Sequence, residues 1–341
     1  MKKLIQIIVV TLAAVFLVGC NSNTGSIPAN KKEIMDAFVA GTLDPSYVPA
    51  AFFIHFPGDA KLGEKAVKCH LEYYIKENPD ILKVQFEQSL SSLGDIKDPA
   101  TWESIAPVPE DFYRPTVETI RSILEVAGKD VYVLPTVYSP FQASTHALGE
   151  AGLREGALNH PEEFKKLLGY CTDALIWFVD ECKKMGIEGF YMCCQGGEKK
   201  FEDIPDFHAE FVKPYDLKLF NECVDGTKMN ILHICDWEGT YADLTKYVDY
   251  PGQIVNTPID LDGTVFTVND GVKMFGRPVL GGLERKGTII SGTPEEVAEA
   301  ARKAIAEGPA GKMMLGAECT VSSATIENIQ AAVSTAHHGG R

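Results

Sequence analysis

Several features common in multidomain and nucleic-acid-binding proteins are missing from this sequence of 341 residues. No stretch rich in proline, glycine and serine divides its interior, so nothing predicts a linker between two domains. Basic residues are few, since 32 lysines and arginines face 47 acidic residues and the formal net charge is −15. This balance argues against nucleic acid or an anionic membrane surface as the main partner. With 45% hydrophobic residues, the chain can bury one core of barrel size.

The N-terminus differs from the rest of the chain. Two lysines precede the apolar run LIQIIVVTLAAVF, which is typical of a secretion signal and, at about fifteen residues, is too short to span a bilayer comfortably. The run leads into Leu17-Val18-Gly19-Cys20, which resembles the lipobox of bacterial lipoproteins. We therefore predict a lipoprotein signal peptide over residues 1–20, lipidation of Cys20, a polar tether over 21–30 and one domain over 31–341. The protein would be exported and held at the membrane through its lipid anchor only.

The other eight cysteines do not suggest a disulfide framework. Cys171 and Cys182 lie in helical patterns, and Cys193 and Cys194 are adjacent in a strand pattern. A chain of this length needs no covalent cross-links to be stable, so we expect mostly free thiols.

From residue 50 onward, short apolar runs rich in β-branched and aromatic residues alternate with longer amphipathic stretches. The predicted strands are 50–56, 81–86, 131–138, 187–194, 230–235, 253–259, 277–283 and 312–319. Helix candidates lie between them, and Thr293 offers one of them an N-cap before a proline and two glutamates. Eight strand and helix pairs predict an α/β fold, a single-domain (β/α)8 TIM barrel. A doubly wound open sheet is the alternative, but no Gly-x-Gly-x-x-Gly motif follows the first strand.

Catalytic groups of such a barrel lie where strands end and the following loops begin. Metal-binding and titratable residues are concentrated at the predicted strand ends: His55, Glu87, Tyr138, Cys193, Cys194, Gln195, His233, Cys235, Asp236, Asn256, Asp260, Glu284, Cys319 and Thr320. Some enrichment of this kind is expected from polar loops alone.

Three of these residues form a candidate metal site. His233 and Cys235 are two residues apart in one strand, so their side chains share a face. Cys319 ends the last predicted strand, which faces the strand of His233 across the barrel mouth. One imidazole and two thiolates suit zinc and leave a fourth position open for water or substrate. The alternative is a packed cysteine beside a hydrogen-bonded histidine, and of Cys193 and Cys194 only one could reach the mouth.

Nearly the whole chain after residue 30 resembles the uroporphyrinogen decarboxylase superfamily. The segments that carry the resemblance are VYVLPTVYSPFQAST, GIEGFYMCCQGG, FHAEFVKPYDLKLFN, LHICD, GGLERKGTIISGTPEEV and LGAECTVSSATIENIQAAV. Members share a TIM barrel and include tetrapyrrole decarboxylases and cobamide-dependent methyltransferases. In the methyltransferase branch, a His-x-Cys motif and a distant cysteine hold a zinc ion that activates a thiol such as coenzyme M. The resemblance assigns these catalytic and metal-binding roles to His233, Cys235 and Cys319.

The resemblance thus implies a zinc-dependent enzyme that activates a thiol acceptor for methyl transfer from a corrinoid. Its partners would be a small-molecule thiol, a tetrapyrrole or corrinoid, and a corrinoid protein. Further substrate-binding candidates are His55, Tyr138, His146, Asp260 and Glu284, and Glu284 is also a candidate for the fourth zinc position.

The decarboxylase branch is the alternative, with a role in porphyrin biosynthesis. Decarboxylases carry an early arginine-rich loop that grips substrate carboxylates, whereas the corresponding FIHFPGDAKLGEKA contains no arginine. Their aspartate after the second strand corresponds here to Phe86-Glu87-Gln88, and their tyrosine after the third strand to His146. A second alternative is a ligand-binding lipoprotein without catalysis, because methyl transfer to coenzyme M is cytoplasmic whereas a lipidated chain faces outward.

Overall fold

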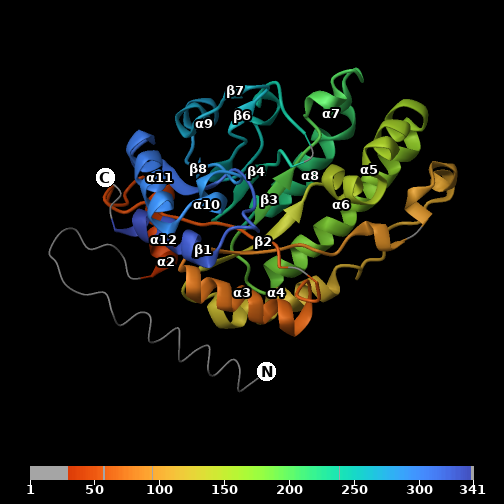
Figure 1. Cartoon of the computed structure of the whole chain (residues 1–341). Helices are drawn as coiled ribbons and strands as arrows, with labels where there is room; N and C mark the ends of the chain where they lie inside the picture. The colour runs from red at the N-terminus through yellow and green to blue at the C-terminus, as the bar shows by residue number, and fades with distance from the viewer. Residues whose placement is uncertain (1–29, 57, 94, 238, 339–341) are drawn as a thin grey trace.

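The computed structural model describes residues 30–338, apart from residues 57, 94 and 238. The predicted signal peptide, Cys20 and all of the tether except Asn30 lie outside the described residues. Seven parallel strands form a curled sheet in the order β1-β2-β3-β4-β5-β8-β9 (Figure 1). They are β1 (Ile81–Val84), β2 (Tyr132–Tyr138), β3 (Tyr191–Cys194), β4 (Ile231–Ile234), β5 (Ile254–Asn256), β8 (Val279–Leu283) and β9 (Met313–Ala317).

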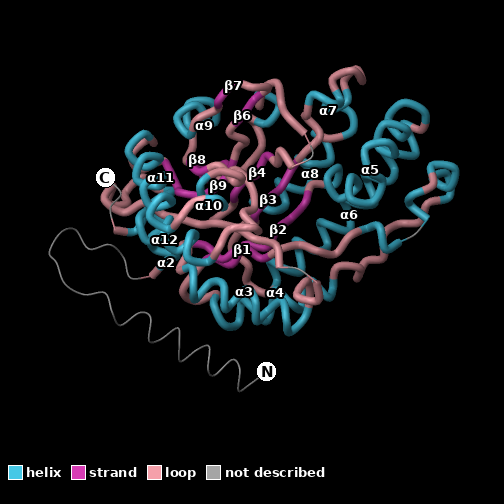
Figure 2. Tube along the Cα trace, viewed as in Figure 1, coloured by secondary structure: helices cyan, strands magenta, loops and turns pink. Residues whose placement is uncertain are grey.

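Helices surround this sheet on its outer face (Figure 2). They are α2 (Lys31–Val39), α3 (Gly63–Glu77), α4 (Arg114–Ala127), α5 (Pro140–Asn159), α6 (Pro161–Lys184), α7 (Phe207–Phe211), α8 (Lys213–Val224), α9 (Val268–Phe275), α10 (Thr288–Ser291), α11 (Pro294–Glu307) and α12 (Ile326–His337). Short 3₁₀ helices are η1 (Leu90–Leu93), η2 (Asp95–Lys97), η3 (Pro99–Ser104), η4 (Lys199–Phe201) and η5 (Thr245–Tyr247). The alternation of parallel strands with covering helices confirms the predicted α/β class and gives a TIM-barrel-like fold.

The first predicted strand, 50–56, differs from the other seven. It forms a single bridge, between Ala50 and Leu315 of β9. The Ala51 amide donates to the Leu315 carbonyl oxygen (2.9 Å), and the Asp80 amide, just before β1, donates to the Ala50 carbonyl oxygen (2.9 Å). The segment therefore runs between the two edges of the seven-stranded sheet, although most of it is not regular strand.

A short hairpin was not predicted from the sequence. The strands β6 (Asp260–Leu261) and β7 (Thr264–Val265) pair antiparallel after β5, outside the main sheet. Residues 257–259, predicted to continue the strand, lead instead into this hairpin.

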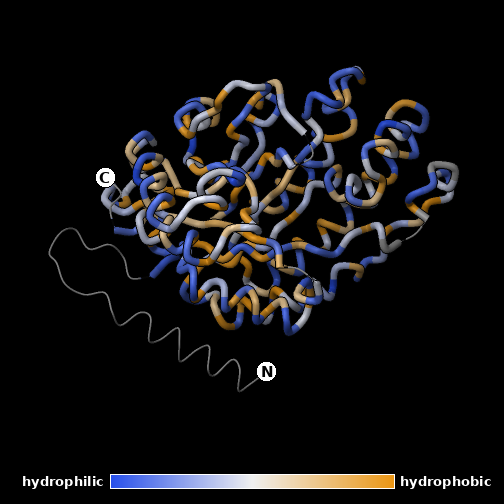
Figure 3. The backbone as a smooth tube through the Cα atoms, in the orientation of Figure 1, coloured by the Kyte–Doolittle hydropathy of each residue, from blue (hydrophilic) through white to orange (hydrophobic). Residues whose placement is uncertain are grey.

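Residues of the strands alternate between two apolar layers. Inward-facing side chains such as Ile81, Leu134 and Ile231 form one cluster inside the sheet. Outward-facing side chains such as Leu82 and Val133 pack against the surrounding helices in a larger cluster. Burial of both faces explains why the strands are continuously apolar in sequence. Hydrophilic and hydrophobic residues alternate along the helices that cover the sheet (Figure 3).

The N-cap predicted at Thr293 is confirmed at the start of α11. The Thr293 side chain accepts a hydrogen bond from the Glu296 amide, and the Glu296 carboxylate accepts one from the Thr293 amide (2.8 Å). This capping box satisfies two backbone donors at the helix start.

Two broader properties also follow from the structure. All eight described cysteines are free, as the sequence led us to expect. In the part of the chain that the structure describes, no helix combines the length and apolarity that crossing a membrane requires.

Candidate functional site

The register of the sheet brings four candidate residues into one row. Tyr138 of β2 pairs with Cys193 of β3, Cys193 pairs with His233 of β4, and His233 pairs with Asn256 of β5. Paired residues of neighbouring parallel strands face the same side of the sheet. All four side chains therefore point inward, near the carboxyl ends of the strands, where barrels carry their chemistry.

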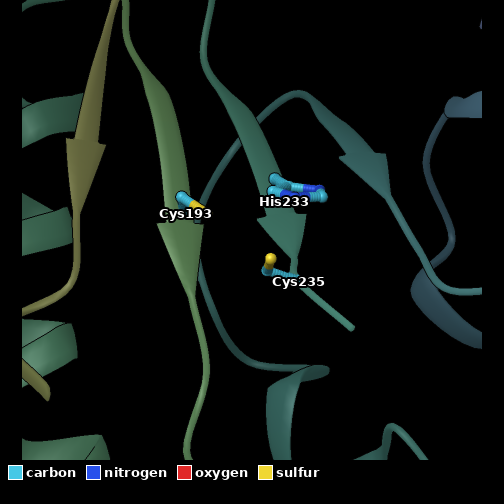
Figure 4. Close-up of side chains that lie close together, drawn as sticks. All are labelled: Cys193, His233 and Cys235. Atoms are coloured by element: carbon cyan, nitrogen blue, oxygen red, sulfur yellow. The ribbon is translucent and has the colours of Figure 1, made fainter. Parts of the chain in front are cut away.

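A buried group of soft donors lies in this row. Ligand atoms of Cys193, His233 and Cys235 are within 4.8 Å of one another (Figure 4). Cys319, which follows β9, joins them, since its thiol contacts both Cys235 and His233. We refer to Cys193, His233, Cys235 and Cys319 as the Cys/His cluster. Its members are between 2% and 7% exposed.

Burial and the closeness of the side chains shift the pKa values of two of the cluster's thiols. Contact with Cys193, together with burial, raises the pKa of the Cys235 thiol well above its ordinary value, although Cys319 acts in the opposite direction. Contact with Cys235 and burial likewise raise the pKa of the Cys319 thiol, and His233 partly offsets them. Both effects favour the neutral form of the Cys235 and Cys319 thiols.

The cluster fits a zinc ion. The Nδ1 atom of His233 is buried and has no hydrogen-bond partner among the described residues. Buried polar atoms rarely lack a partner in native proteins, and a metal ion is one explanation for such an atom. Imidazole and thiolate are the donors that zinc prefers, and a cation would favour deprotonation of the thiols.

Surrounding residues hold the cluster in place. The His233 ring stacks on Tyr191, with centroids 5.2 Å apart. The Tyr191 hydroxyl donates to Asn256 Oδ1 (2.8 Å), and Asn256 Nδ2 donates to the carbonyl oxygens of Leu280 (2.8 Å) and Ala317 (3.0 Å). One buried amide thus links β3, β5, β8 and β9 beneath the site.

The cluster opens into a cavity of about 390 Å³. Its wall includes the apolar and aromatic side chains of Phe86, Tyr138 and Trp237 as well as the polar Gln142 and Gln195. A volume of this size is typical of small-molecule sites. The Cys/His cluster is therefore reachable by a small ligand, although its own side chains are buried.

An ion-paired group lies elsewhere on the cavity wall. His55 Nδ1 is 2.6 Å from Glu87 Oε1, and Lys61 Nζ is 3.5 Å from Glu87 Oε2. Burial would raise the pKa of Glu87, but the hydrogen bond and charge of His55 and the charge of Lys61 outweigh it and lower that pKa. Glu87 is therefore an ionised carboxylate at neutral pH.

The rim of the cavity carries a second charged group. The Arg285 guanidinium lies over the Trp237 ring, 4.8 Å from its centroid, and its Nε is 3.3 Å from Glu318 Oε1. Burial raises the pKa of Glu318 to about 7. Trp237 remains 59% exposed, so a large aromatic face borders the entrance.

The structure brings together most of the residues predicted from the sequence. His233, Cys235, Cys319, His55, Tyr138 and His146 all line the cavity. Two predicted residues, Asp260 and Glu284, are not among the described residues that line this cavity. Asp260 is exposed in the β6-β7 hairpin, where its carboxylate accepts a hydrogen bond from the Gly263 amide (2.9 Å). Glu284 is exposed beside α10 and α11, in a separate hollow, because the chain turns away from the mouth after β8.

Sequence reasoning gave too little weight to Cys193 and did not identify Lys83. Cys193 and Cys194 are adjacent, and only the pairing of β3 with β4 shows that Cys193 is the one facing His233. Lys83 lies in the first parallel strand, two residues after the inward-facing Ile81, and lines the cavity. Burial lowers the pKa of Lys83, whereas the thiolate forms of Cys319 and Cys193 would raise it. The signal that would have identified it is a charged residue at an inward position of an apolar strand.

Comparisons with known proteins agree with this picture. The family model described as "Uroporphyrinogen decarboxylase (URO-D)" matches residues 64–339. Two curated relatives are the methylcobamide:CoM methyltransferases MtbA of Methanosarcina acetivorans and Methanosarcina mazei. The first is 24% identical over 211 residues and the second 24% identical over 214, and each alignment covers 61% of this chain. These alignments span 58% of the length of each relative.

Solved structures show the same fold. A methyltransferase from Methanosarcina mazei superposes with a TM-score of 0.72 at 16% identity, covering 90% of this chain and 98% of that one. A B12-independent methionine synthase from a Shewanella species gives a TM-score of 0.53 at 13% identity, covering 85% and 97%. Because the family model matches more than half of the sequence, the chain belongs to the uroporphyrinogen decarboxylase (URO-D) family.

Proposed function

We propose that this protein is a zinc-dependent methyltransferase that activates a small thiol for methyl transfer from a corrinoid. The observation that carries the proposal is the buried Cys/His cluster at the base of an open cavity. The similarity to methylcobamide:CoM methyltransferases supports it. His233, Cys235 and Cys319 would hold the ion, and the acceptor thiol would bind beside them from the cavity.

A zinc ion bound here would lower the pKa of the acceptor thiol, so that a thiolate is present at neutral pH. A corrinoid would supply the methyl group: the thiolate sulfur would form a bond to the methyl carbon as the carbon–cobalt bond breaks, and the bonding electron pair would stay with cobalt. The chain's own residues position the acceptor. The aromatic side chains of Phe86 and Tyr138 line the cavity in which the acceptor would bind, and Lys83 on the same wall would face an anionic acceptor.

The test of this proposal is methylcobalamin-dependent methylation of a panel of small thiols. Wild-type protein is expected to give thioether product and demethylated cobalamin in equal amounts. His233→Ala should give neither above the uncatalysed rate, whereas Asp260→Ala, in the exposed hairpin, should match wild type. Equal rates for wild type and His233→Ala would overturn the proposal.

The decarboxylase function is less well supported by the cavity. Uroporphyrinogen carries eight carboxylates, which require a strong basic patch. Among the described residues of the cavity wall, Lys61 and Lys83 are the basic side chains besides histidine, and Lys61 already pairs with Glu87. Incubation with uroporphyrinogen tests this alternative directly, because coproporphyrinogen would accumulate if the protein were a decarboxylase.

We also infer that the barrel is closed and that the protein is anchored to a membrane. The hydrogen bonds of residues 49–51 to Leu315 and Asp80 support a closed barrel in which this segment takes the eighth strand position. The lipobox supports an exported protein anchored through Cys20. For Cys20→Ala, we expect release from the membrane fraction or loss of processing, and unchanged anchoring would exclude acylation.

A further inference from the structure

Cys193 is not needed by the site that the His-x-Cys motif and Cys319 define, yet it lies within it. Its sulfur is within 4.8 Å of the ligand atoms of His233 and Cys235. Its thiol also contacts the Cys235 thiol closely enough to alter its pKa. Four soft donors from three strands thus meet at the base of one cavity.

This number of donors matches a complete zinc coordination sphere. Zinc with three thiolates and one imidazole is four-coordinate and tetrahedral. With zinc–sulfur bonds of about 2.3 Å, two sulfur ligands lie roughly 3.8 Å apart, so a 4.8 Å separation closes with small side-chain movements.

The adjacent Cys194 shows that the position of Cys193 is specific. Cys194 pairs with Ile234 and packs in the apolar layer between the sheet and the helices. Cys193 faces the cavity instead. The two neighbours therefore differ in the face they occupy and not in exposure, since both are buried.

A positively charged side chain nearby would favour three thiolate ligands at this site. Zinc with three thiolates carries a net charge of −1, which is costly to bury without a counter-charge. Lys83 lies on the same cavity wall, and its Nζ, 5.2 Å from the centroids of the Tyr191 and Phe53 rings, could supply that counter-charge.

Resting on the proposed function, we propose that Cys193 is the fourth zinc ligand of the resting protein and the ligand that an incoming acceptor thiol replaces. In the exchange, the bond from the metal to the Cys193 sulfur breaks and a bond to the acceptor sulfur forms. The acceptor's thiol proton passes to Cys193, so no charge is added to the buried site. Four protein ligands usually mark a closed structural zinc site, but this cluster opens into a cavity that can admit the acceptor.

X-ray absorption at the zinc edge of the full-length protein tests this assignment. Wild type and Cys194→Ala are expected to show three sulfur ligands and one nitrogen. Cys193→Ala and the nearly isosteric Cys193→Ser should each lose one sulfur while retaining zinc. Two sulfur ligands in zinc-loaded wild type would overturn the inference and leave the proposed function intact. No zinc in wild type would overturn the proposed function and this inference with it.

A selenol probe identifies the ligand that is displaced. Reduced selenocysteamine should add one selenium ligand to wild type and lower its sulfur count from three to two. In Cys193→Ala, selenium should bind while the sulfur count stays at two. A wild-type sulfur count that stays at three after addition of the selenol would show that Cys193 is not replaced and would overturn the exchange.

Discussion

Asp80 joins the start of β1 to both ends of the described chain. Its carboxylate, which is completely buried, accepts hydrogen bonds from the Tyr47 hydroxyl and the Ala50 amide, both at 2.7 Å. It also lies 2.8 Å from His337 Nε2 in α12 and 3.8 Å from Lys31 Nζ in α2. This one group therefore connects α2, the 49–51 segment and α12 around the edge where the sheet begins and ends.

Replacing the carboxylate with an amide should be strongly destabilising. Asp80→Asn leaves the Lys31 ammonium, whose side chain is less than 10% exposed, without its counter-charge and replaces the carboxylate that faces His337 Nε2. Removing one partner of a buried ion pair costs about 3–5 kcal/mol of unfolding free energy. Tyr47→Phe is the matched control, since it removes one hydrogen bond from the same carboxylate and should cost about 1 kcal/mol.

The cost should also depend on pH. Burial would raise the pKa of Asp80, but the charges of His337 and Lys31 and its hydrogen bonds outweigh burial and hold that pKa well below its usual range. A group with a lowered folded-state pKa stabilises the protein above its unfolded pKa, and this stabilisation is lost as the pH falls toward the folded value. The advantage of wild type over Asp80→Asn should thus shrink by about 1.4 kcal/mol per pH unit below about pH 4.

Urea unfolding followed by far-UV circular dichroism measures both effects. At pH 7 we expect Asp80→Asn to unfold at a clearly lower urea concentration than Tyr47→Phe. At pH 3 the gap between wild type and Asp80→Asn should have narrowed. Equal stabilities of the two variants at pH 7, or a gap that is independent of pH, would show that the Asp80 carboxylate does not stabilise the fold through its charge.

Substitutions at three further positions test separate parts of the structure. Asn256→Ala removes three buried hydrogen bonds, one from the Tyr191 hydroxyl and two to the carbonyl oxygens of Leu280 and Ala317. It should therefore lower the unfolding free energy by at least about 2 kcal/mol in urea titrations, and a loss below about 0.5 kcal/mol would argue against the network. Thr293→Ala removes the α11 cap and should cost about 1 kcal/mol, whereas Thr293→Ser should be nearly neutral. Asp260→Ala should leave zinc content unchanged, because this carboxylate lies in the exposed hairpin, and loss of metal would contradict that placement.

Much of the site could be predicted because strand periodicity is local information. The spacing of His233 and Cys235 places both on one face whatever the partner strands are. Cys319 is distant in sequence, but its position after an apolar run places it at the same end of the sheet. To predict that these three residues lie together, only the order and the direction of the strands were required.

The other features of the site and the fold could not be predicted, because they depend on contacts between segments that are far apart in the sequence. The choice between Cys193 and Cys194 requires the register between β3 and β4, which is set by packing across the whole sheet. The outward position of Glu284 follows from the path of the chain after β8, and the apolar pattern of that strand does not encode it. The 50–56 run has the composition of a strand, yet it forms one isolated bridge, and its composition does not encode how far it pairs with β9.

The proposed function requires a metal ion in the Cys/His cluster. The decisive measurement is the zinc content of purified full-length protein after mild chelation, compared between wild type and the double variant His233→Ala/Cys235→Ala. We predict about one zinc per chain in wild type and almost none in the variant, because binding requires the deprotonated side-chain ligands. Metal-free wild type, or equal zinc in both proteins, would contradict the central claim.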